Sequence, residues 1–216
     1  NEMGLPIDRI NVLHFQSLTG KGITAKVNGE NYYAGSPNMF HDLLGHKMNE
    51  ALTRQIEALQ SEGKTIIIFG TINEILLLIA ASDQIGDVSR EVIQKLHKLG
   101  IERTVMLTGD NIRTAEAVGT LAGVTDIKAD LLPGDKLNAI KELRRTHHSV
   151  AMVGDGVNDA PALAAATVGV AMGGAGTDTA LETADIALMA DDLNKLPFTI
   201  KLSRRAVRII KQHITF

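Results

Sequence analysis

The chain has 216 residues and a formal net charge of −3, and it is 44% hydrophobic and 22% charged. This length can bury a core and hold one large or two small domains, and the composition is that of a globular protein. Aromatic residues make up only 3% and Trp is absent, which argues against a stacking surface for single-stranded nucleic acid, and the negative charge gives no general attraction to DNA. The absence of Cys excludes disulfides within these residues and fits a reducing compartment.

The first 82 residues predict a small antiparallel sheet with few helices. Two alternating runs, residues 23–27 and 31–35, are separated by Asn28-Gly29, which is a strong hairpin signal. An amphipathic helix is expected over residues 48–62, and a second hairpin follows from residue 65 to residue 80. These elements indicate an α+β domain.

Gly20 and Gly22 precede the first hairpin. They are too closely spaced for a dinucleotide fingerprint, which needs a third glycine that opens a helix. The pair is interpreted either as a turn before a strand or as a place where a nucleotide lies against bare backbone.

From Asp83 onward the pattern changes to alternating helices and strands. Helices are expected over residues 88–99, 112–121, 135–144, 160–166 and from 193 onward, and strands over residues 104–107, 127–131, 150–153, 168–172 and 186–189. This alternation indicates βαβ units and a parallel, doubly wound sheet. The domain boundary is therefore placed near Ser82 and Asp83.

Two predicted strands end in a glycine and a carboxylate. Residues 150–153 lead into Gly154-Asp155-Gly156, with Asp159 four residues after Asp155, and residues 104–107 lead into Thr108-Gly109-Asp110. The carboxyl ends of parallel strands open on one edge of a sheet, so these loops should converge. Carboxylates suit Mg²⁺, and hydroxyl and backbone N–H groups suit phosphate. A helix-capping Asp in an ordinary turn is the plainer alternative for the Asp155 loop alone.

Lys136 stands near the start of a predicted helix, after Pro133-Gly134-Asp135. A lysine in this place is usually a solvated surface residue. The alternative is a fixed cation that neutralises a phosphoryl group. The spacing leaves both readings open.

The C-terminal segment is basic. No Asp or Glu follows Asp192, whereas six Lys and Arg residues do: Lys195, Lys201, Arg204, Arg205, Arg208 and Lys211. Such a helix either precedes a membrane span on its cytoplasmic side or is a solvated surface helix. No stretch is long and apolar enough to span a bilayer, there is no signal peptide, and the first residue is Asn1, so a fragment of a longer protein is expected.

Taken together, these motifs resemble those of P-type ATPases, in particular the heavy-metal exporters of the cadmium, zinc and lead group. The matching segments are Thr108-Gly109-Asp110-Asn111, Pro133-Gly134-Asp135-Lys136, the run from Val153 to Leu163, and Gly173-Gly174-Ala175-Gly176-Thr177-Asp178. In this order and spacing they are highly specific, and they cover essentially all of residues 83–216. Residues 15–82 resemble the later part of the family's nucleotide-binding domain.

The resemblance implies a haloacid-dehalogenase-like phosphorylation domain over residues 83–216 and a partial, smaller nucleotide-binding domain over residues 1–82. In this family an aspartate of an Asp-Lys-Thr-Gly-Thr motif attacks the γ-phosphate of ATP and forms an aspartyl-phosphate. Carried over to this chain, Thr108 would bind the phosphoryl group, Asp110 would support that loop, and Lys136 would neutralise the phosphate. Asp155 would ligate Mg²⁺ with help from Asp159, while Asn158 would hydrogen-bond at the phosphate.

The nucleotide contacts implied by the resemblance are glycines. Gly20, Gly22 and Gly35 would stand at the glycine-rich ATP site, and Gly109 would lie in the phosphate loop. Ser36 stands where many relatives have Asn. The implied partners are ATP, the transported heavy-metal ion, and the actuator and transmembrane domains of the same pump, with no nucleic acid. The implied location is the cytoplasmic face of an integral protein of the cell membrane.

The departures from the family pattern are as informative as the matches. No Asp-Lys-Thr-Gly-Thr and no Glu-His-Pro adenine-site segment occurs among the 216 residues, and Gly86 stands where the family motif has Arg. These residues alone are therefore not expected to phosphorylate themselves, and the missing strand should lie centrally in the sheet. Two alternatives remain: a soluble phosphatase of the same superfamily, which would need an Asp-x-Asp nucleophile that is not found near the N-terminus, and a non-catalytic nucleotide- or Mg²⁺-binding fragment.

Overall fold

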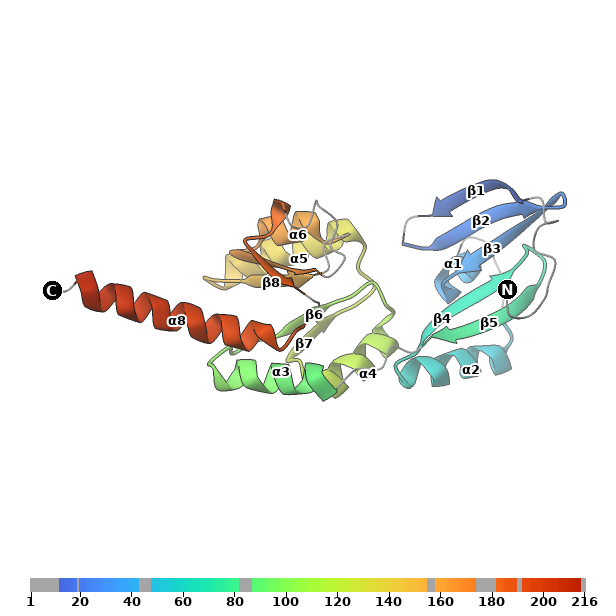
Figure 1. Cartoon of the computed structure of the whole chain (residues 1–216). Coiled ribbons are helices and arrows are strands. Elements are labelled where there is room, and N and C mark those ends of the chain that lie inside the picture. Colours follow the sequence, from blue (N-terminus) through green and yellow to red (C-terminus); the bar gives the residue numbers. More distant parts are fainter. Residues whose placement is uncertain are drawn as a thin grey trace. The chain divides into compact units, whose positions relative to one another are not determined.

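The chain divides into two units, Asn1–Asp83 (unit 1) and Gln84–Phe216 (unit 2), which are described separately (Figure 1). The structure is a computed structural model that describes residues 12–18, 20–42, 48–81, 87–154, 158–173, 182–189 and 192–214. Several residues discussed above lie outside this description: Asn1, Ser82, Asp83, Gly86, Asp155, Gly156 and the segment Gly174-Ala175-Gly176-Thr177-Asp178.

Unit 1 is an antiparallel sheet with two helices. Its strands, in spatial as well as sequence order, are β1 (Val12–Leu18), β2 (Gly22–Val27), β3 (Glu30–Gly35), β4 (Thr65–Gly70) and β5 (Ile75–Ala81), and its helices are α1 (Pro37–Asp42) and α2 (Glu50–Ser61). The predicted β2–β3 hairpin is confirmed, since Val27 pairs with Glu30 across Asn28-Gly29. Both turn residues have positive φ, 51° and 91°, which is the conformation that two-residue hairpin loops require.

The core of unit 1 lies between the helices and one face of the sheet. Ile66 and Ile68 alternate along β4 and are buried against Met39 and Phe40 of α1 and Ile56 of α2. The alternation follows from the two-residue period of a strand, which sends successive side chains to opposite faces. The opposite face of the β4–β5 hairpin is exposed and apolar.

Two elements of unit 1 were not predicted. The sequence of β1 shows no clean alternation of apolar and polar residues. The strand itself is irregular, since its pairing with β2 shifts register between Leu13 and Gln16 and His14 has a positive φ of 51°. α1 spans only six residues, which is too short to display the helical periodicity that sequence analysis depends on.

Unit 2 shows the predicted alternation of helices and strands. Its elements are α3 (Asp87–Lys98), β6 (Val105–Leu107), α4 (Ile112–Ala122), β7 (Asp126–Lys128), α5 (Pro133–Thr146), β8 (Ala151–Gly154), α6 (Ala160–Ala165), β9 (Val168–Gly173), β10 (Ile186–Met189) and α8 (Lys195–Ile214). The pairs β6–β7, β8–β9 and β9–β10 are all parallel. Unit 2 is therefore an α/β domain, as expected.

The parallel strands of unit 2 form two pieces. One has the order β10-β9-β8 and the other consists of β6 and β7, and within the described residues β6 and β8 do not pair. Helices cover both faces of the larger piece. On one face α3 and α8 pack through Val92 and Leu196 onto Val170, and on the other α5 and α6 pack onto Met152. Such two-sided cover defines a doubly wound arrangement.

Among the described residues, no helix has the length and apolar character that crossing a membrane requires. The longest, α8, contains 20 residues. Leu196 and Pro197 in its first turn are buried, whereas every residue from Lys201 to Ile214 is exposed.

At the amino ends of β6 and β7, Arg103 joins three elements. Its Nε and Nη2 atoms donate to Asp126 Oδ2 at 3.0 and 2.8 Å, and its Nη1 lies 3.0 Å from His147 Nε2 at the end of α5. The hydrogen bond from Arg103 holds the pKa of the Asp126 carboxyl below its usual range. Arg103 thus links β6, β7 and α5 at the edge of the strands opposite to the loops that follow β6 and β8.

Replacing Arg103 by Gln is expected to raise the pKa of Asp126 toward the ordinary value of about 3.9. A carboxyl whose pKa is lowered on folding stabilises the protein above its unfolded-state pKa, and that contribution is lost as the pH falls through the folded-state pKa. Arg103→Gln should therefore lose less stability than the unchanged chain as the pH falls below the ordinary carboxyl pKa of about 3.9. NMR titration of the carboxyl and urea unfolding at each pH measure both effects. Arg90→Gln on the exposed side of α3 is the control, and an equal change in both variants would contradict the assignment.

Candidate functional site

The loops that follow β6 and β7 are joined at the carboxyl edge of the parallel strands. The N–H of Leu131 donates to the carbonyl of Thr108 at 3.0 Å, and the N–H of Asp130 donates to the carbonyl of Asp110 at 2.8 Å. Asp130 has a φ of 55°, a left-handed conformation that Asp tolerates better than most residues. This turn ends β7 and directs the chain across the Thr108 loop.

Thr108 and Asp110 form a small closed turn. The Thr108 Oγ1 hydroxyl donates to Asp110 Oδ2 at 3.0 Å and accepts from the Asp110 N–H at 3.1 Å. Between them, a Cβ on Gly109 would stand 3.2 Å from the carbonyl oxygen of Leu131, so a glycine fits the crossing of the two loops. Asp110 therefore contacts the loop that it was predicted to support.

Lys136 follows directly from the second loop. The carboxylate of Asp135 accepts from the N–H of Leu132 at 3.0 Å and caps the start of α5. One residue further on, the Lys136 side chain is only 18% exposed, and its Nζ donates to Asp159 Oδ1 at 2.9 Å. The structure thus contradicts the reading of Lys136 as an ordinary solvated lysine.

Asp159 lies at the end of the turn that follows β8. The residue is 8% exposed and its backbone carbonyl accepts from the N–H of Leu163 in α6. A Cβ on Gly154 would stand 2.9 Å from Asp159 Oδ2, so the glycine at the strand end makes room for the carboxylate. Asn158 is exposed beside it.

The described part of the site brings together residues from three strand ends. Thr108, Gly109 and Asp110 follow β6, the loop after β7 contacts them and leads to Lys136, and Lys136 is paired with Asp159 after β8. Asp155, the predicted Mg²⁺ ligand, lies outside the described residues. Within the described residues no group of three His, Cys or acidic side chains could hold a metal ion.

In unit 1 the three predicted glycines lie close together. Gly22 pairs with Gly35 across β2 and β3, and a Cβ on Gly22 would stand 2.2 Å from the carbonyl oxygen of Ala34. A Cβ on Gly35 would stand 2.4 Å from the carbonyl oxygen of Lys21 and 2.7 Å from Met39 Sδ. Gly22 and Gly35 therefore have a packing role, because they let the turn at Lys21 approach the start of α1, where the N–H of Ser36 donates to the carbonyl of Lys21 at 3.1 Å.

Ser36 has a capping role. Its Oγ accepts from the N–H of Met39 at 3.2 Å, at the start of α1. Ser is a good helix N-cap, because its hydroxyl can accept from a free N–H of the first turn.

Sequence reasoning missed Asp130, whose N–H donates to the carbonyl of Asp110, because it falls inside the strand predicted over residues 127–131. Asp130 is a polar residue shortly before Leu131-Leu132-Pro133. An Asp close to a Pro is typical of a turn, and this signal could have ended the predicted strand before residue 130. The pairing of Lys136 with Asp159 joins residues 23 positions apart and left no local signal.

Comparison with known proteins agrees with this arrangement. The family model for haloacid dehalogenase-like hydrolases matches residues 6–167, and the chain belongs to this family. It is 58% identical over 215 residues to a probable cadmium-transporting ATPase of Alkalihalophilus pseudofirmus, and the match covers 100% of this chain and 30% of that protein. The chain therefore spans about a third of the length of this relative.

Solved structures of metal-transporting and CPx-type ATPases also match this chain. A zinc-transporting PIB-type ATPase in the E2.Pi state matches with a TM-score of 0.64 and 39% identity over 95% of this chain and 32% of its own. The catalytic domain of a CPx-ATPase matches with a TM-score of 0.66 and 25% identity over 93% of this chain and 68% of its own. The resemblance to heavy-metal P-type ATPases and the predicted fold class are both confirmed.

Gly22→Ala is expected to destabilise unit 1 by about 1–3 kcal/mol, because the added methyl group must displace the backbone of β3. Both Tyr residues of the chain, Tyr32 and Tyr33, lie on β3, so tyrosine fluorescence during urea unfolding reports on unit 1. Gly134→Ala, where a Cβ would meet nothing within 4 Å, is the matched control. Equal unfolding midpoints for Gly22→Ala and the unchanged chain would contradict the packing role.

A double-mutant cycle with Lys136→Met and Asp159→Asn is expected to give a coupling energy of about 1–3 kcal/mol, since the pair is largely shielded from water. Circular dichroism at helical wavelengths during urea unfolding follows unit 2, where most of the described helix lies. Lys128 and Glu142, an ion pair with 36% and 57% exposed side chains, give the control cycle, which should show a coupling below about 1 kcal/mol. A Lys136–Asp159 coupling no larger than this control would show that the contact contributes little.

Proposed function

We propose that these residues are the ATP-binding and phosphorylation region of a heavy-metal-exporting P-type ATPase. In this proposal the whole protein couples Mg-ATP hydrolysis, through an aspartyl-phosphate, to export of Zn²⁺-, Cd²⁺- or Pb²⁺-type ions. The observation that carries it is the meeting of Lys136 with Asp159 beside the Thr108 loop, in a chain that matches cadmium- and zinc-transporting ATPases over nearly its whole length.

Lys136 would supply the positive charge that neutralises the phosphoryl group. Phosphoryl transfer depends mainly on positioning and on neutralising charge. The ammonium group is fixed at 2.9 Å from Asp159 Oδ1, so it is held in place before any phosphate arrives. On binding, it would turn some of its hydrogen-bonding capacity toward a phosphoryl oxygen.

Thr108 and Asp110 would act together. The Thr108 hydroxyl now donates to Asp110, and it can donate to a phosphoryl oxygen only by rotating away from that carboxylate. Asp110 would then hold the loop through its backbone contacts to Thr108 and Asp130. Asn158, exposed beside Asp159, would add an amide hydrogen bond to the phosphate.

Mg²⁺ would be held chiefly by Asp155, with Asp159 in a supporting place. Carboxylates are the hard oxygen ligands that this ion prefers, and it usually takes one or two of them together with phosphate oxygens. Asp159 Oδ1 already accepts from Lys136 and Oδ2 lies against Gly154, which favours Asp155 as the principal ligand. When bound, Mg²⁺ would neutralise charge on the phosphates of ATP.

The nucleophile would come from a strand outside the 216 residues. No Asp-Lys-Thr-Gly-Thr motif occurs in the sequence. In the described residues β6 pairs with β7 and β8 with β9, while Leu107 at the end of β6 packs against the core cluster that includes Met152 of β8. A parallel strand between β6 and β8 would deliver an aspartate at its carboxyl end, beside Thr108 and Lys136.

Unit 1 would supply part of the ATP site, with the closely packed Gly20, Gly22 and Gly35 next to the nucleotide. The remaining partners would be the actuator and transmembrane domains of the same pump, and the region would lie at the cytoplasmic face of the cell membrane. Stimulation of the whole protein's ATPase by Zn²⁺, Cd²⁺, Pb²⁺ or Cu⁺ would identify its ion.

The 216-residue chain is expected to bind ATP without steady phosphate release, while the full-length protein should form an acid-stable phosphoenzyme from radiolabelled ATP. In the full-length protein, Asp155→Ala should abolish phosphoenzyme and Lys136→Ala should lower its rate of formation by about a hundredfold or more. Lys141→Ala, on the exposed side of the same helix α5, is the matched control. Steady phosphate release by the isolated chain, or normal phosphoenzyme in Asp155→Ala at saturating Mg²⁺, would sink the proposal.

A further inference from the structure

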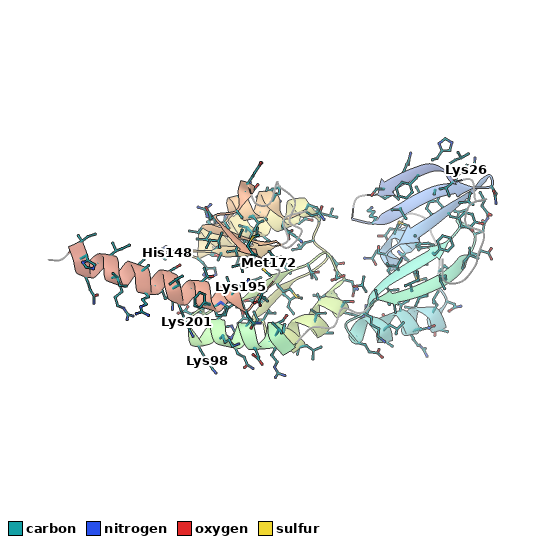
Figure 2. All side chains as sticks on the ribbon, viewed as in Figure 1. Lys26, Lys98, His148, Met172, Lys195 and Lys201 are labelled. Carbon is teal, nitrogen blue, oxygen red and sulfur yellow. The ribbon has the colours of Figure 1, made fainter. Side chains whose placement is uncertain are left out.

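Thr114 is a polar side chain on the buried face of α4. The residue is 1% exposed. A Cβ on Gly119, further along the same face, would stand 2.6 Å from Ile127 Cδ1 of β7, so α4 lies close against the parallel strands. The helix also contacts α3, whose last residue, Lys98, is labelled in Figure 2. A valine would fill the place of Thr114 without a hydroxyl that needs a partner, so the buried hydroxyl requires an explanation.

The hydroxyl of Thr114 holds the side chain of Asn111, which caps the start of α4. Asn111 Nδ2 donates to Thr114 Oγ1 at 2.8 Å, and Asn111 Oδ1 accepts from the Thr114 N–H at 3.1 Å. Because a backbone N–H can only donate, it must face the amide oxygen, which leaves the amide nitrogen facing the hydroxyl. One orientation of the Asn111 amide therefore satisfies both contacts. The carbonyl of Asn111 also accepts from the N–H of Ala115 at 2.9 Å, so the first turn of α4 fixes both its main chain and its side chain.

Asn111 directly follows Asp110, which belongs to the Thr108 turn. Asp110 Oδ2 accepts from the Thr108 hydroxyl, and the Asp110 carbonyl accepts from the N–H of Asp130. In the proposed reaction the hydroxyl must rotate away from Asp110 toward a phosphoryl oxygen, which removes the first of these contacts. The position of Asp110 then depends more strongly on its main-chain contacts and on the fixed residue beside it, Asn111.

We propose that Thr114 is a positioning residue for the proposed phosphoryl transfer. Through Asn111 it holds Asp110 in place, so that the loop keeps its shape when the Thr108 hydroxyl turns to the phosphoryl group. The inference rests on the proposed function and gives a role in it to a residue that would touch neither phosphate nor metal. The plainer alternative is that Thr114 only completes the cap of α4. A cap stabilises the helix alone, whereas a positioning contact also fixes the loop and acts on the chemical step more than on ATP binding.

Hydrogen exchange of the 216-residue chain tests the contact without ATP. In Thr114→Val the Asn111 amide loses its acceptor. The N–H of Asp130, which donates to the Asp110 carbonyl, is therefore expected to exchange about tenfold faster, while the amides of β9 keep their rates. Thr114→Ser retains the hydroxyl and should exchange like the unchanged chain. Thr120→Val is the matched control, because Thr120 is exposed on the same helix. Equal exchange of the Asp130 N–H in the two valine variants, or an equal rise throughout β9, would overturn the inference.

Phosphoenzyme formation in the full-length protein tests the consequence for the reaction. Thr114→Val is expected to lower the rate at saturating ATP about tenfold with an unchanged KM, because a displaced loop weakens interactions made in the transition state. Thr114→Ser should keep most of the rate. A Thr114→Val rate equal to that of Thr120→Val, a loss confined to KM, or an equal loss in Thr114→Ser would contradict the positioning role. If the unchanged full-length protein forms no phosphoenzyme, the proposed function fails instead, and the exchange of the Asp130 N–H still decides whether Thr114 holds the loop.

Discussion

The ion pair between Lys136 and Asp159 connects the two pieces of the parallel sheet at the edge where the site lies. Lys136 follows the loop that leaves β7, and Asp159 follows the turn that leaves β8. Their side chains are 18% and 11% exposed, so both charges have lost much of their hydration. Taking two ions out of water is costly, and removing one partner leaves the other charge stranded. The relative position of α5 and α6 near the site therefore depends on both groups being present.

This pairing also sets the charge of the site before a ligand binds. Because Asp159 already neutralises Lys136, an arriving phosphate would find little excess positive charge among these two residues. A polyphosphate would need a second cation, which is the part that Mg²⁺ on Asp155 would play in the proposed reaction. In the proposed reaction Asp159 would therefore act chiefly by positioning Lys136, with a smaller share in holding the ion.

Much of this arrangement was predictable because the signals are local. Apolar runs that end in Gly and Asp predicted where the strands end, and Asn28-Gly29 predicted the hairpin in which Val27 pairs with Glu30. What could not be predicted depends on contacts between distant residues. The partner of Lys136 is 23 positions away, and the close approach of Gly22 to Gly35 depends on the strand pairing itself. The strand expected over residues 127–131 ends at Lys128, because Asp130 adopts a left-handed conformation that turns the chain toward the Thr108 loop.

In the described residues the two pieces of parallel sheet, β6–β7 and β8–β9–β10, share a core although β6 and β8 do not pair. Leu107 packs against the cluster that includes Met152 and Ile140, so the two pieces of sheet lie on one scaffold. Unpaired backbone groups on facing edges are a template for another strand. If that strand is parallel, its carboxyl end opens at the edge where Thr108 and Lys136 already lie, because the carboxyl ends of parallel strands share one edge. The residues that would act on a phosphoryl group are thus positioned by loops and an ion pair around the place that a nucleophile would occupy.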